Sequence, residues 1–253
     1  MRTLRRPALL TTALLLTLPL AACGGADDAG SGEAGRIQVL AAASLTDVFE
    51  QLGTDFEESE RAEVEFSFGS STDLAEQAAD GAPGDVLATA DETSMTVAED
   101  ADAAQDVQVF ATNVLTIVVP PGNPAGISSL ADLEGTTWVR CADEAPCGRV
   151  ALAVLEDAGV SAEPASLEED VRATLDKVTS GEADAGLVYA SDAVAAGDAV
   201  ESVPIEGADE QPTSYYVADL AQSEDPELAQ AWVDYVLGEE GRRALEDAGF
   251  TLP

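Results

Sequence analysis

The chain has 253 residues, enough for one large or two small α/β domains, and 46% of them are hydrophobic, which is ample for a core. Its 49 acidic residues against 11 basic ones give a formal net charge of −38, so the surface repels nucleic acids and anionic lipid headgroups as partners. It contains no histidine, which excludes Ser-His-Asp and Cys-His nucleophiles and removes the usual zinc ligand.

Residues 1–22 predict an export signal. Arginines precede an apolar run over residues 8–20 that is too short to span a membrane comfortably. The run ends in the tetrapeptide LAAC, which resembles a bacterial lipobox. We therefore expect cleavage before Cys23, a diacylglycerol on its sulfur, and anchoring on the extracytoplasmic face of the cell membrane. The alternative is an ordinary signal peptide whose cleavage site carries a cysteine.

Residues 23–35 follow the signal and read CGGADDAGSGEAG. This mixture of glycine, alanine and acids predicts a flexible, disordered tether. Removal of the signal takes away three arginines and no acids, so the formal net charge changes from −38 to −41.

The first folded segment reads as a strand, a turn of small residues and a helix. Residues 37–40 predict a short buried strand, and apolar residues recur at helical spacing over 45–56. We expect Ser44, at the end of the turn, to be the N-cap of that helix. A helix N-terminus has unpaired backbone N–H groups that can bind an anion, and the Ser44 hydroxyl would add a donor. The alternative is that Ser44 only caps its helix.

A second copy of this arrangement follows. Residues 64–68 alternate like a strand, and the turn GSST at 69–72 opens another helix. Two such turns at the carboxyl ends of neighbouring parallel strands would face one crevice, where open α/β sheets bind ligands. The repeat therefore favours Ser44 as a ligand donor over a simple cap. A third strand, near 86–88, ends just before Asp91.

The chain is predicted to cross between two domains twice. Strands at 107–110 and 114–119 flank residues 111–113, so the first crossing is placed near Thr112. We expect residues 36–111 and 211–253 to form the first domain and residues 112–210 the second. The other expected elements are a short helix at 127–133, strands at 136–141, 200–205 and 215–218, a strand ending at Tyr189, and helices at 150–158, 226–237 and 241–247.

Two cysteines precede the helix expected at 150–158. In an exported protein, Cys141 and Cys147 favour a disulfide that closes a small loop. A metal site is the competing interpretation, but two cysteines without histidine fall short of a full coordination shell. Cys147 follows Pro146, a residue suited to the start of a helix, so its backbone N–H should lie near a helix N-terminus.

Several short stretches, taken in order, resemble the molybdate-binding proteins of bacterial ABC transporters. The likeness covers residues 37–253, and although each stretch alone is a weak signal, their order is specific. They are AASLT at 42–46, FGSS at 68–71, GAPGDV at 81–86, PCG at 146–148, EDVR at 169–172, AGLVY at 185–189 and AGF at 248–250.

The resemblance implies a type II periplasmic-binding-protein fold, with two α/β domains joined by two crossovers that close on a tetrahedral oxyanion. It implies that Ser44 and Ser71 donate through hydroxyls and amides, that Cys147 and Val171 donate backbone amides, and that the Tyr189 hydroxyl completes the shell. The family commonly has alanine at the position of Cys147, a change that a main-chain contact tolerates.

The sequence thus predicts a monomeric, extracytoplasmic lipoprotein that captures molybdate or tungstate and delivers it to an ABC transporter permease. We expect no enzymatic activity, no cofactor and no metal cation. Sulfate or another tetrahedral oxyanion is the alternative ligand. The residues are also compatible with an enzyme in which Asp91 or Asp192 activates a crevice serine, and with an adhesin or sensor that has no transport role.

Overall fold

The computed structural model describes residues 35–253. The predicted signal peptide, Cys23 and all but the last residue of the predicted tether lie outside the described residues. Across the described part of the chain, no helix is both long and apolar enough to cross a membrane.

The first of two five-stranded sheets has the strand order β2-β1-β3-β10-β4. Strands β1 (Arg36–Ala42), β2 (Glu63–Gly69) and β3 (Val86–Thr89) are parallel. Strand β10 (Thr213–Leu220) is antiparallel both to β3 and to β4 (Ala104–Asn113). We call this sheet and its helices the first lobe. The carboxyl ends of β1, β2 and β3 therefore meet at one edge, as the repeated strand-turn-helix pattern predicted.

The second sheet has the order β7-β6-β8-β5-β9 and, with its helices, forms the second lobe. Strand β6 (Trp138–Cys141) is parallel to β7 (Ser166–Glu168) and β8 (Ala185–Tyr189). Strand β5 (Leu115–Val119) is antiparallel to β8 and to β9 (Glu201–Pro204). Both lobes thus combine a parallel core with antiparallel strands next to the crossings.

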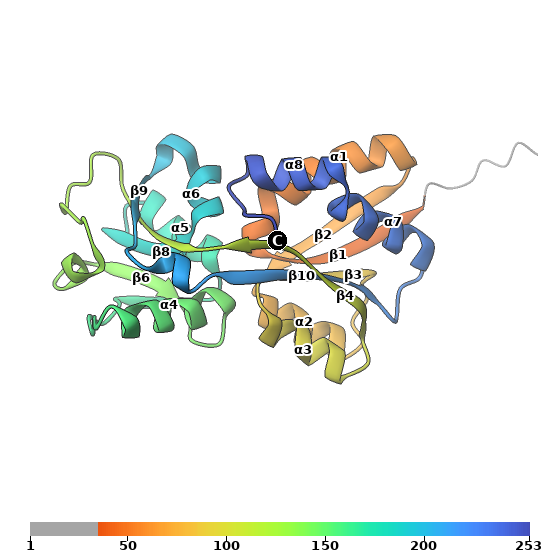
Figure 1. Ribbon diagram of the computed structural model, residues 1–253, viewed down its shortest axis with the longest axis horizontal. Helices are drawn as coiled ribbons and strands as arrows, with labels where there is room; N and C mark the ends of the chain where they lie inside the picture. Colours follow the sequence, from red (N-terminus) through yellow and green to blue (C-terminus); the bar gives the residue numbers. More distant parts are fainter. Residues whose placement is uncertain (1–34) are drawn as a thin grey trace, which may run out of the picture. The chain divides into compact units, whose positions relative to one another are not determined.

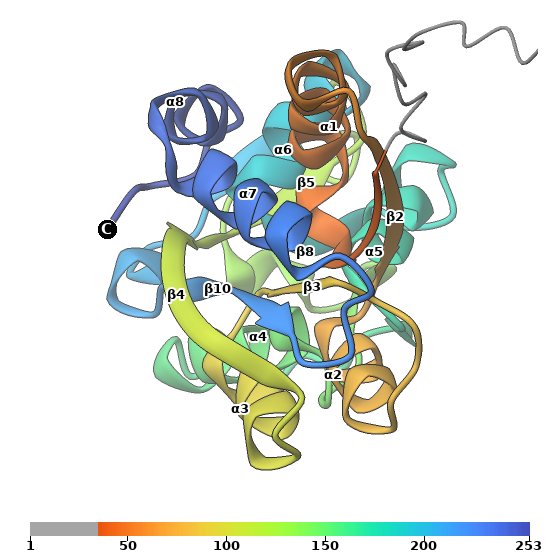
Figure 2. The ribbon, with the colours of Figure 1, turned by 90° about the vertical axis from the view of Figure 1, so that its right-hand side faces the viewer.

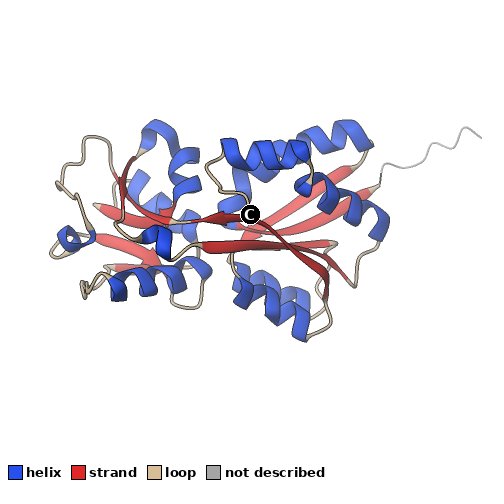
Figure 3. Ribbon diagram, viewed as in Figure 1, coloured by secondary structure: helices blue, strands red, loops and turns tan. Residues whose placement is uncertain are grey.

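Helices cover both faces of each sheet (Figures 1 and 3). In the first lobe, α1, α7 and α8 lie on one face and α2 and α3 on the other, as Figure 2 shows from the end of the lobe. In the second lobe, α4 lies opposite α5 and α6. The helices are α1 (Thr46–Glu60), α2 (Ser71–Ala79), α3 (Glu92–Asp100), α4 (Pro146–Asp157), α5 (Val171–Thr179), α6 (Ala190–Ala196), α7 (Pro226–Leu237) and α8 (Glu239–Asp247).

Aromatic packing fixes α1 and α7 against the first sheet. The apolar spacing of α1 places Phe49 and Phe56 on its buried face, and both rings meet Trp232 of α7 edge-on, at centroid distances of 5.5 and 5.3 Å. Edge-to-face pairs of this kind add about 0.5–1.5 kcal/mol beyond the area they bury. The segment after the second crossing is therefore packed onto the first strand–helix unit of the chain.

The chain passes from the first sheet to the second at Val114 and returns between Pro204 and Thr213. Residues 111–113 were expected to separate two strands. That was wrong, because these residues continue β4 and pair with residues 213–215 of β10. That pairing joins segments about a hundred residues apart, so local sequence gave no sign of it. The division into domains at residues 112 and 211 stays a prediction.

The short helix expected at 127–133 was also partly wrong. Only the 3₁₀ turn η2 (Leu130–Leu133) forms there. The side chain of Asn123 bonds both the N–H and the C=O of Ile127, at 3.0 and 2.7 Å. These side-chain bonds take the place of helical ones at Ile127 and hold it in a loop.

Candidate functional site

The five predicted ligand-binding residues line one cavity between the two lobes. Ser44 and Ser71 reach it from the first lobe, and Cys147, Val171 and Tyr189 reach it from the second. The centre of a water molecule can occupy about 10 Å³ of this space, close to the minimum that holds one water. Sites for drug-sized organic ligands are about 300–1,000 Å³, so this cavity fits only a small, compact guest.

Ser44 does not cap a helix, so that prediction was wrong. It lies inside the 3₁₀ turn η1 (Ala43–Leu45), which tightens the chain after β1 before α1 begins at Thr46. Its side chain is buried, and its Oγ lies 2.8 Å from the hydroxyl of Tyr215 in β10. The contact ties Ser44 to β10, which lies two strands from β1 in the same sheet.

Ser71 is the first residue of α2, after the N-cap residue Ser70. Its buried Oγ accepts a hydrogen bond of 2.9 Å from the backbone N–H of Ala90, just beyond β3. A serine hydroxyl has one proton and two lone pairs, so accepting this bond leaves the proton available to a guest. Ser71 is thus both a structural acceptor and a candidate ligand donor.

Cys147 is the second residue of α4, after Pro146 in the first position. The N–H of Arg149 donates to the carbonyl of Ala145, which is the first bond of α4. The N–H of Cys147 comes before this bond, in the first turn, where backbone N–H groups have no acceptor within the helix. A disulfide joins Cys147 to Cys141, as predicted, with their Cα atoms 5.7 Å apart. The helix start lies so close to the loop that a Cβ at Gly148 would come within 1.8 Å of the Ala142 oxygen.

Val171 is the first residue of α5 and is buried. The N-cap residue Asp170 accepts hydrogen bonds from the N–H groups of Arg172 and Ala173, at 2.8 and 2.9 Å. The Asp170 carboxylate is thus occupied by the helix it caps. The Val171 N–H, at the cavity, remains for a guest.

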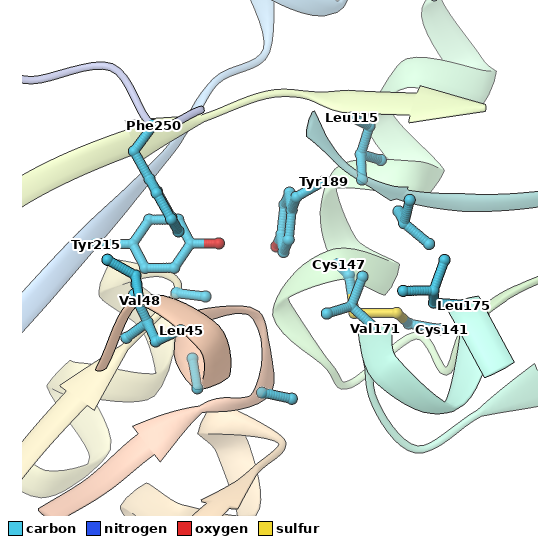
Figure 4. Packing of buried hydrophobic residues seen from close by; sticks show 14 of the residues in the cluster. Leu45, Val48, Leu115, Cys141, Cys147, Val171, Leu175, Tyr189, Tyr215 and Phe250 are labelled. Atoms are coloured by element: carbon cyan, nitrogen blue, oxygen red, sulfur yellow. A yellow bond between two sulfur atoms is a disulfide. The ribbon is translucent and has the colours of Figure 1, made fainter. Parts of the chain in front are cut away.

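Tyr189 ends β8, and its hydroxyl is buried without a hydrogen-bond partner among residues 35–253. Figure 4 places its ring between Tyr215 of the first lobe and Cys147 and Val171 of the second. Leaving a buried hydroxyl unpaired costs roughly 1–3 kcal/mol, so a partner is expected in the cavity. Burial raises the pKa of Tyr189 well above its ordinary value, which keeps the hydroxyl protonated and able to donate.

Two ion pairs join the lobes beside the cavity. Arg149 of α4 contacts Asp91, the N-cap of α3, with 2.6 Å between Nη2 and Oδ2. Arg172 of α5 contacts Asp47 of α1 and, within its own lobe, Asp192, with 3.1 Å between Nε and Oδ1. Neither arginine is among the residues that line the cavity.

Further hydrogen bonds support the Arg149 pair. Its Nη2 donates to Ser94 Oγ at 3.0 Å, and Thr72 of α2 donates to the Glu144 carbonyl of the second lobe at 2.7 Å. Sequence reasoning assigned no role to Arg149 or Arg172. The sequence did contain a signal for these ion pairs. An arginine in the first turn of a helix lies at the positive end of the helix dipole, so a nearby acid is needed to compensate its charge.

The carboxylates that an enzyme would need as bases are occupied elsewhere. Asp91 accepts from Ser94 N and Arg149, and fully buried Asp192 accepts from Tyr189 N at 3.1 Å. The Ser44 hydroxyl is instead bonded to the Tyr215 hydroxyl, and the Ser71 hydroxyl accepts from the N–H of Ala90. No group of three or more His, Cys, Asp or Glu side chains among residues 35–253 is arranged to hold a metal ion. In the described part of the chain neither serine hydrogen bonds to a carboxylate, and the site offers donors that suit an anion.

Comparisons with known proteins give a consistent result. Residues 37–251 match the family model for bacterial extracellular solute-binding proteins. Molybdate-binding protein ModA of Mycobacterium tuberculosis is 38% identical over 248 residues, with 94% of this chain and 95% of the relative covered. Molybdate-binding protein ModA of Escherichia coli is 30% identical, with 86% and 90% covered.

Solved structures share the fold. The periplasmic molybdate-binding protein of Azotobacter vinelandii superposes with a TM-score of 0.72 at 20% identity, with 86% of this chain and 99% of that chain covered. The sulfate-binding protein SubI of Mycobacterium tuberculosis superposes with a TM-score of 0.75 at 21% identity, with 85% and 86% covered. At these identities the likeness establishes the fold alone.

Proposed function

The chain belongs to the family of bacterial extracellular solute-binding proteins, and from this premise we propose that it binds molybdate for an ABC transporter. Membership confirms the resemblance stated from the sequence motifs and the predicted α/β binding-protein fold. It also confirms that the chain is not an enzyme, because its relatives are solute-binding proteins. The family places its action outside the cytoplasm.

The observation that carries the proposal is the set of uncharged donors around one small cavity. The Tyr189 hydroxyl has no partner among the described residues, Ser71 has a free proton, and α4 and α5 begin at the cavity wall. Among the described residues that line the cavity there is no lysine or arginine. Such a set of donors suits a small anion as the ligand.

Hydrogen bonds to a charged guest contribute roughly 1.5–3 kcal/mol each. Several together can outweigh the repulsion that a dianion meets in a chain with a formal net charge of −38. This supports a tetrahedral oxyanion as the ligand, with tungstate accepted as well as molybdate because the two ions share charge, shape and size, whereas sulfate is smaller.

Sulfate is the second candidate. The sulfate-binding protein SubI shares this fold, which supports the fold but not the ligand at 21% identity. The relatives at 38% and 30% identity are molybdate-binding proteins, so we prefer molybdate. We further propose that the mature protein is monomeric, that Cys23 carries a lipid anchor, and that the loaded protein delivers its oxyanion to a permease.

Isothermal titration of the mature chain, with Cys23→Ser to avoid lipidation, tests the ligand. We expect molybdate and tungstate to bind comparably and sulfate to bind at least about tenfold more weakly. Sulfate binding as tightly as molybdate would transfer the assignment to sulfate. Failure of all three ions to bind would overturn the proposal.

A further inference from the structure

Helices α2, α4 and α5 each present their N-cap residue and their first residue to the cavity, but their caps differ. The N-cap residues of α2 and α4, Ser70 and Ala145, make no side-chain hydrogen bond to their helices. Helix α5 is capped by Asp170, whose Oδ1 accepts from the N–H groups of Arg172 and Ala173. Among the described residues that line the cavity, Asp170 is the one aspartate, glutamate, lysine or arginine. One of the three helix ends is therefore already paired with a carboxylate.

Within the described part of the chain, no side chain compensates the Asp170 carboxylate directly. Arg172, two residues further along α5, forms its ion pairs with Asp47 and Asp192. None of the ion pairs among residues 35–253 includes Asp170, and its Oδ2 accepts no hydrogen bond from these residues. Its charge is therefore balanced by backbone N–H groups at the positive end of α5 and not by a cation.

Capping α5 does not itself require a charge. Asparagine and serine cap a helix about as well as aspartate, because each offers a side-chain oxygen to the same N–H groups. A carboxylate adds a negative charge at the end of α5 where an oxyanion would meet the Val171 N–H. Like charges repel more strongly in a small cavity between two lobes than in bulk water. The Asp170 charge thus opposes an anionic ligand, although the cap stabilises the helix.

From this balance of charge we propose that Asp170 limits the affinity of the site for oxyanions and promotes their release. The carboxylate occupies two N–H groups of α5 and leaves the ligand the N–H of Val171. Affinity differences among variants of one site arise mostly in the dissociation rate, so the carboxylate shortens the time for which the oxyanion stays bound. Such release suits a protein that delivers its ligand. This inference rests on the proposed function, since it concerns the same cavity.

Asp170→Asn tests the proposal, because it removes the charge and keeps a capping oxygen. Titration of the mature chain, again with Cys23→Ser, should show a gain in molybdate affinity of at least about threefold, and stopped-flow measurement should show a similar fall in the dissociation rate. The melting temperature of the unliganded protein should stay within about 2–4 °C of wild type, since the cap remains. An unchanged or lower molybdate affinity would overturn the proposal.

Asp225→Asn is the matched control. Asp225 is the N-cap residue of α7 and accepts from the N–H of Leu228 at 3.1 Å, but it does not line the cavity. The variant makes the same change in net charge and in the type of cap, so its molybdate affinity should equal that of wild type. An equal gain in the two variants would assign the effect to the net charge of the chain and overturn the role of Asp170.

Two further variants separate the charge of Asp170 from the amide that asparagine adds. Asp170→Ser caps without a charge and without an amide, so it should also bind molybdate more tightly than wild type. It also covers the case in which Asp170→Asn does not fold. Asp170→Glu keeps the charge and should show no gain. A gain with glutamate, or none with serine, would contradict the proposal.

The failure of this inference differs from the failure of the proposed function. If wild type does not bind molybdate, tungstate or sulfate, the proposed function fails. If wild type binds molybdate and neither uncharged variant of Asp170 binds it more tightly, the proposed function stands and the role of Asp170 is wrong.

Discussion

The hydrogen-bond donors at the cavity wall are uncharged, whereas the contacts that join the lobes beside it are ion pairs. Ser71, Val171 and Tyr189 offer a hydroxyl or an amide to the interior. Close to the start of α4, Arg149 bonds Asp91 across the lobes, and the residue after Val171, Arg172, bonds Asp47. Neighbouring residues in the same helices therefore have different electrostatic tasks.

The neutral donors therefore serve to bind the ligand, and the ion pairs serve to hold the two lobes together. Neutral donors bind an anion without bringing a counter-charge that would itself need desolvation. Ion pairs at the rim are partly exposed, so their charges lose less solvation than a fully buried pair would. Both pairs connect residues of different lobes, so they stabilise the arrangement described here. The predictions that follow are ordered by their expected effect on oxyanion affinity.

Ser71→Ala should have the largest effect. Loss of the hydroxyl should weaken molybdate binding at least about tenfold, because a charge-assisted bond is removed. It should also lower the free energy of unfolding of the unliganded protein by about 1–3 kcal/mol, since Ala90 N–H loses its buried acceptor. Titration and denaturant unfolding measure the two quantities. Ser59→Ala, at the far end of α1, is the control and should leave molybdate affinity unchanged. If Ser71→Ala also left the affinity unchanged, Ser71 would be only a structural hydrogen-bond acceptor.

Arg149→Gln should weaken binding by about three- to tenfold without touching the cavity wall. The Arg149 and Asp91 side chains are 29% and 14% exposed, so the contribution is reduced by solvent but not lost. Arg243→Gln removes the same charge from an exposed pair within α8 and should leave affinity unchanged. Equal effects of the two variants would mean that net charge, and not the contact between lobes, is responsible.

Loss of the disulfide should change stability more than affinity. The double variant Cys141→Ser with Cys147→Ser should lower the free energy of unfolding by about 2 kcal/mol, the value for a short closed loop. Molybdate affinity should change less than about twofold, because Cys147 offers its backbone N–H. A tenfold loss of affinity would indicate that the disulfide itself shapes the cavity wall.

Asp192 should make the free energy of unfolding depend on pH, whereas molybdate affinity should not show this dependence. Burial raises its pKa from 3.8 to about 7, and the Arg172 guanidinium opposes the shift. Between these values the folded state holds a proton that the unfolded chain has lost, so this residue's contribution to stability falls as pH rises. The stability of wild type minus that of Asp192→Asn should therefore decrease from about pH 4 to about pH 7 and then level off. A difference that is constant with pH would contradict the raised pKa.

Local pattern was enough for much of the fold. The strand-turn-helix repeats, the helix at 226–237 and the disulfide were predicted from residue type and spacing, and the structure contains each. All five predicted ligand residues line one cavity, although their contacts with a ligand stay predictions. Prediction was wrong where a distant segment intervened, at Ser44, which turns to Tyr215, and at 111–113, which pair with β10.

The sequence by itself determined which stretches become strands and helix starts, and hence which amides and hydroxyls point toward the carboxyl ends of the strands. Those properties depend on neighbours within a few residues. Only the tertiary structure decided that Asp91 meets Arg149, that Asp47 meets Arg172, and that Tyr215 reaches Ser44 across 171 positions of sequence. Such pairs form because the order of strands within a sheet, or the contact between the two lobes, brings distant side chains within a few ångströms, and no periodicity along one segment records that approach.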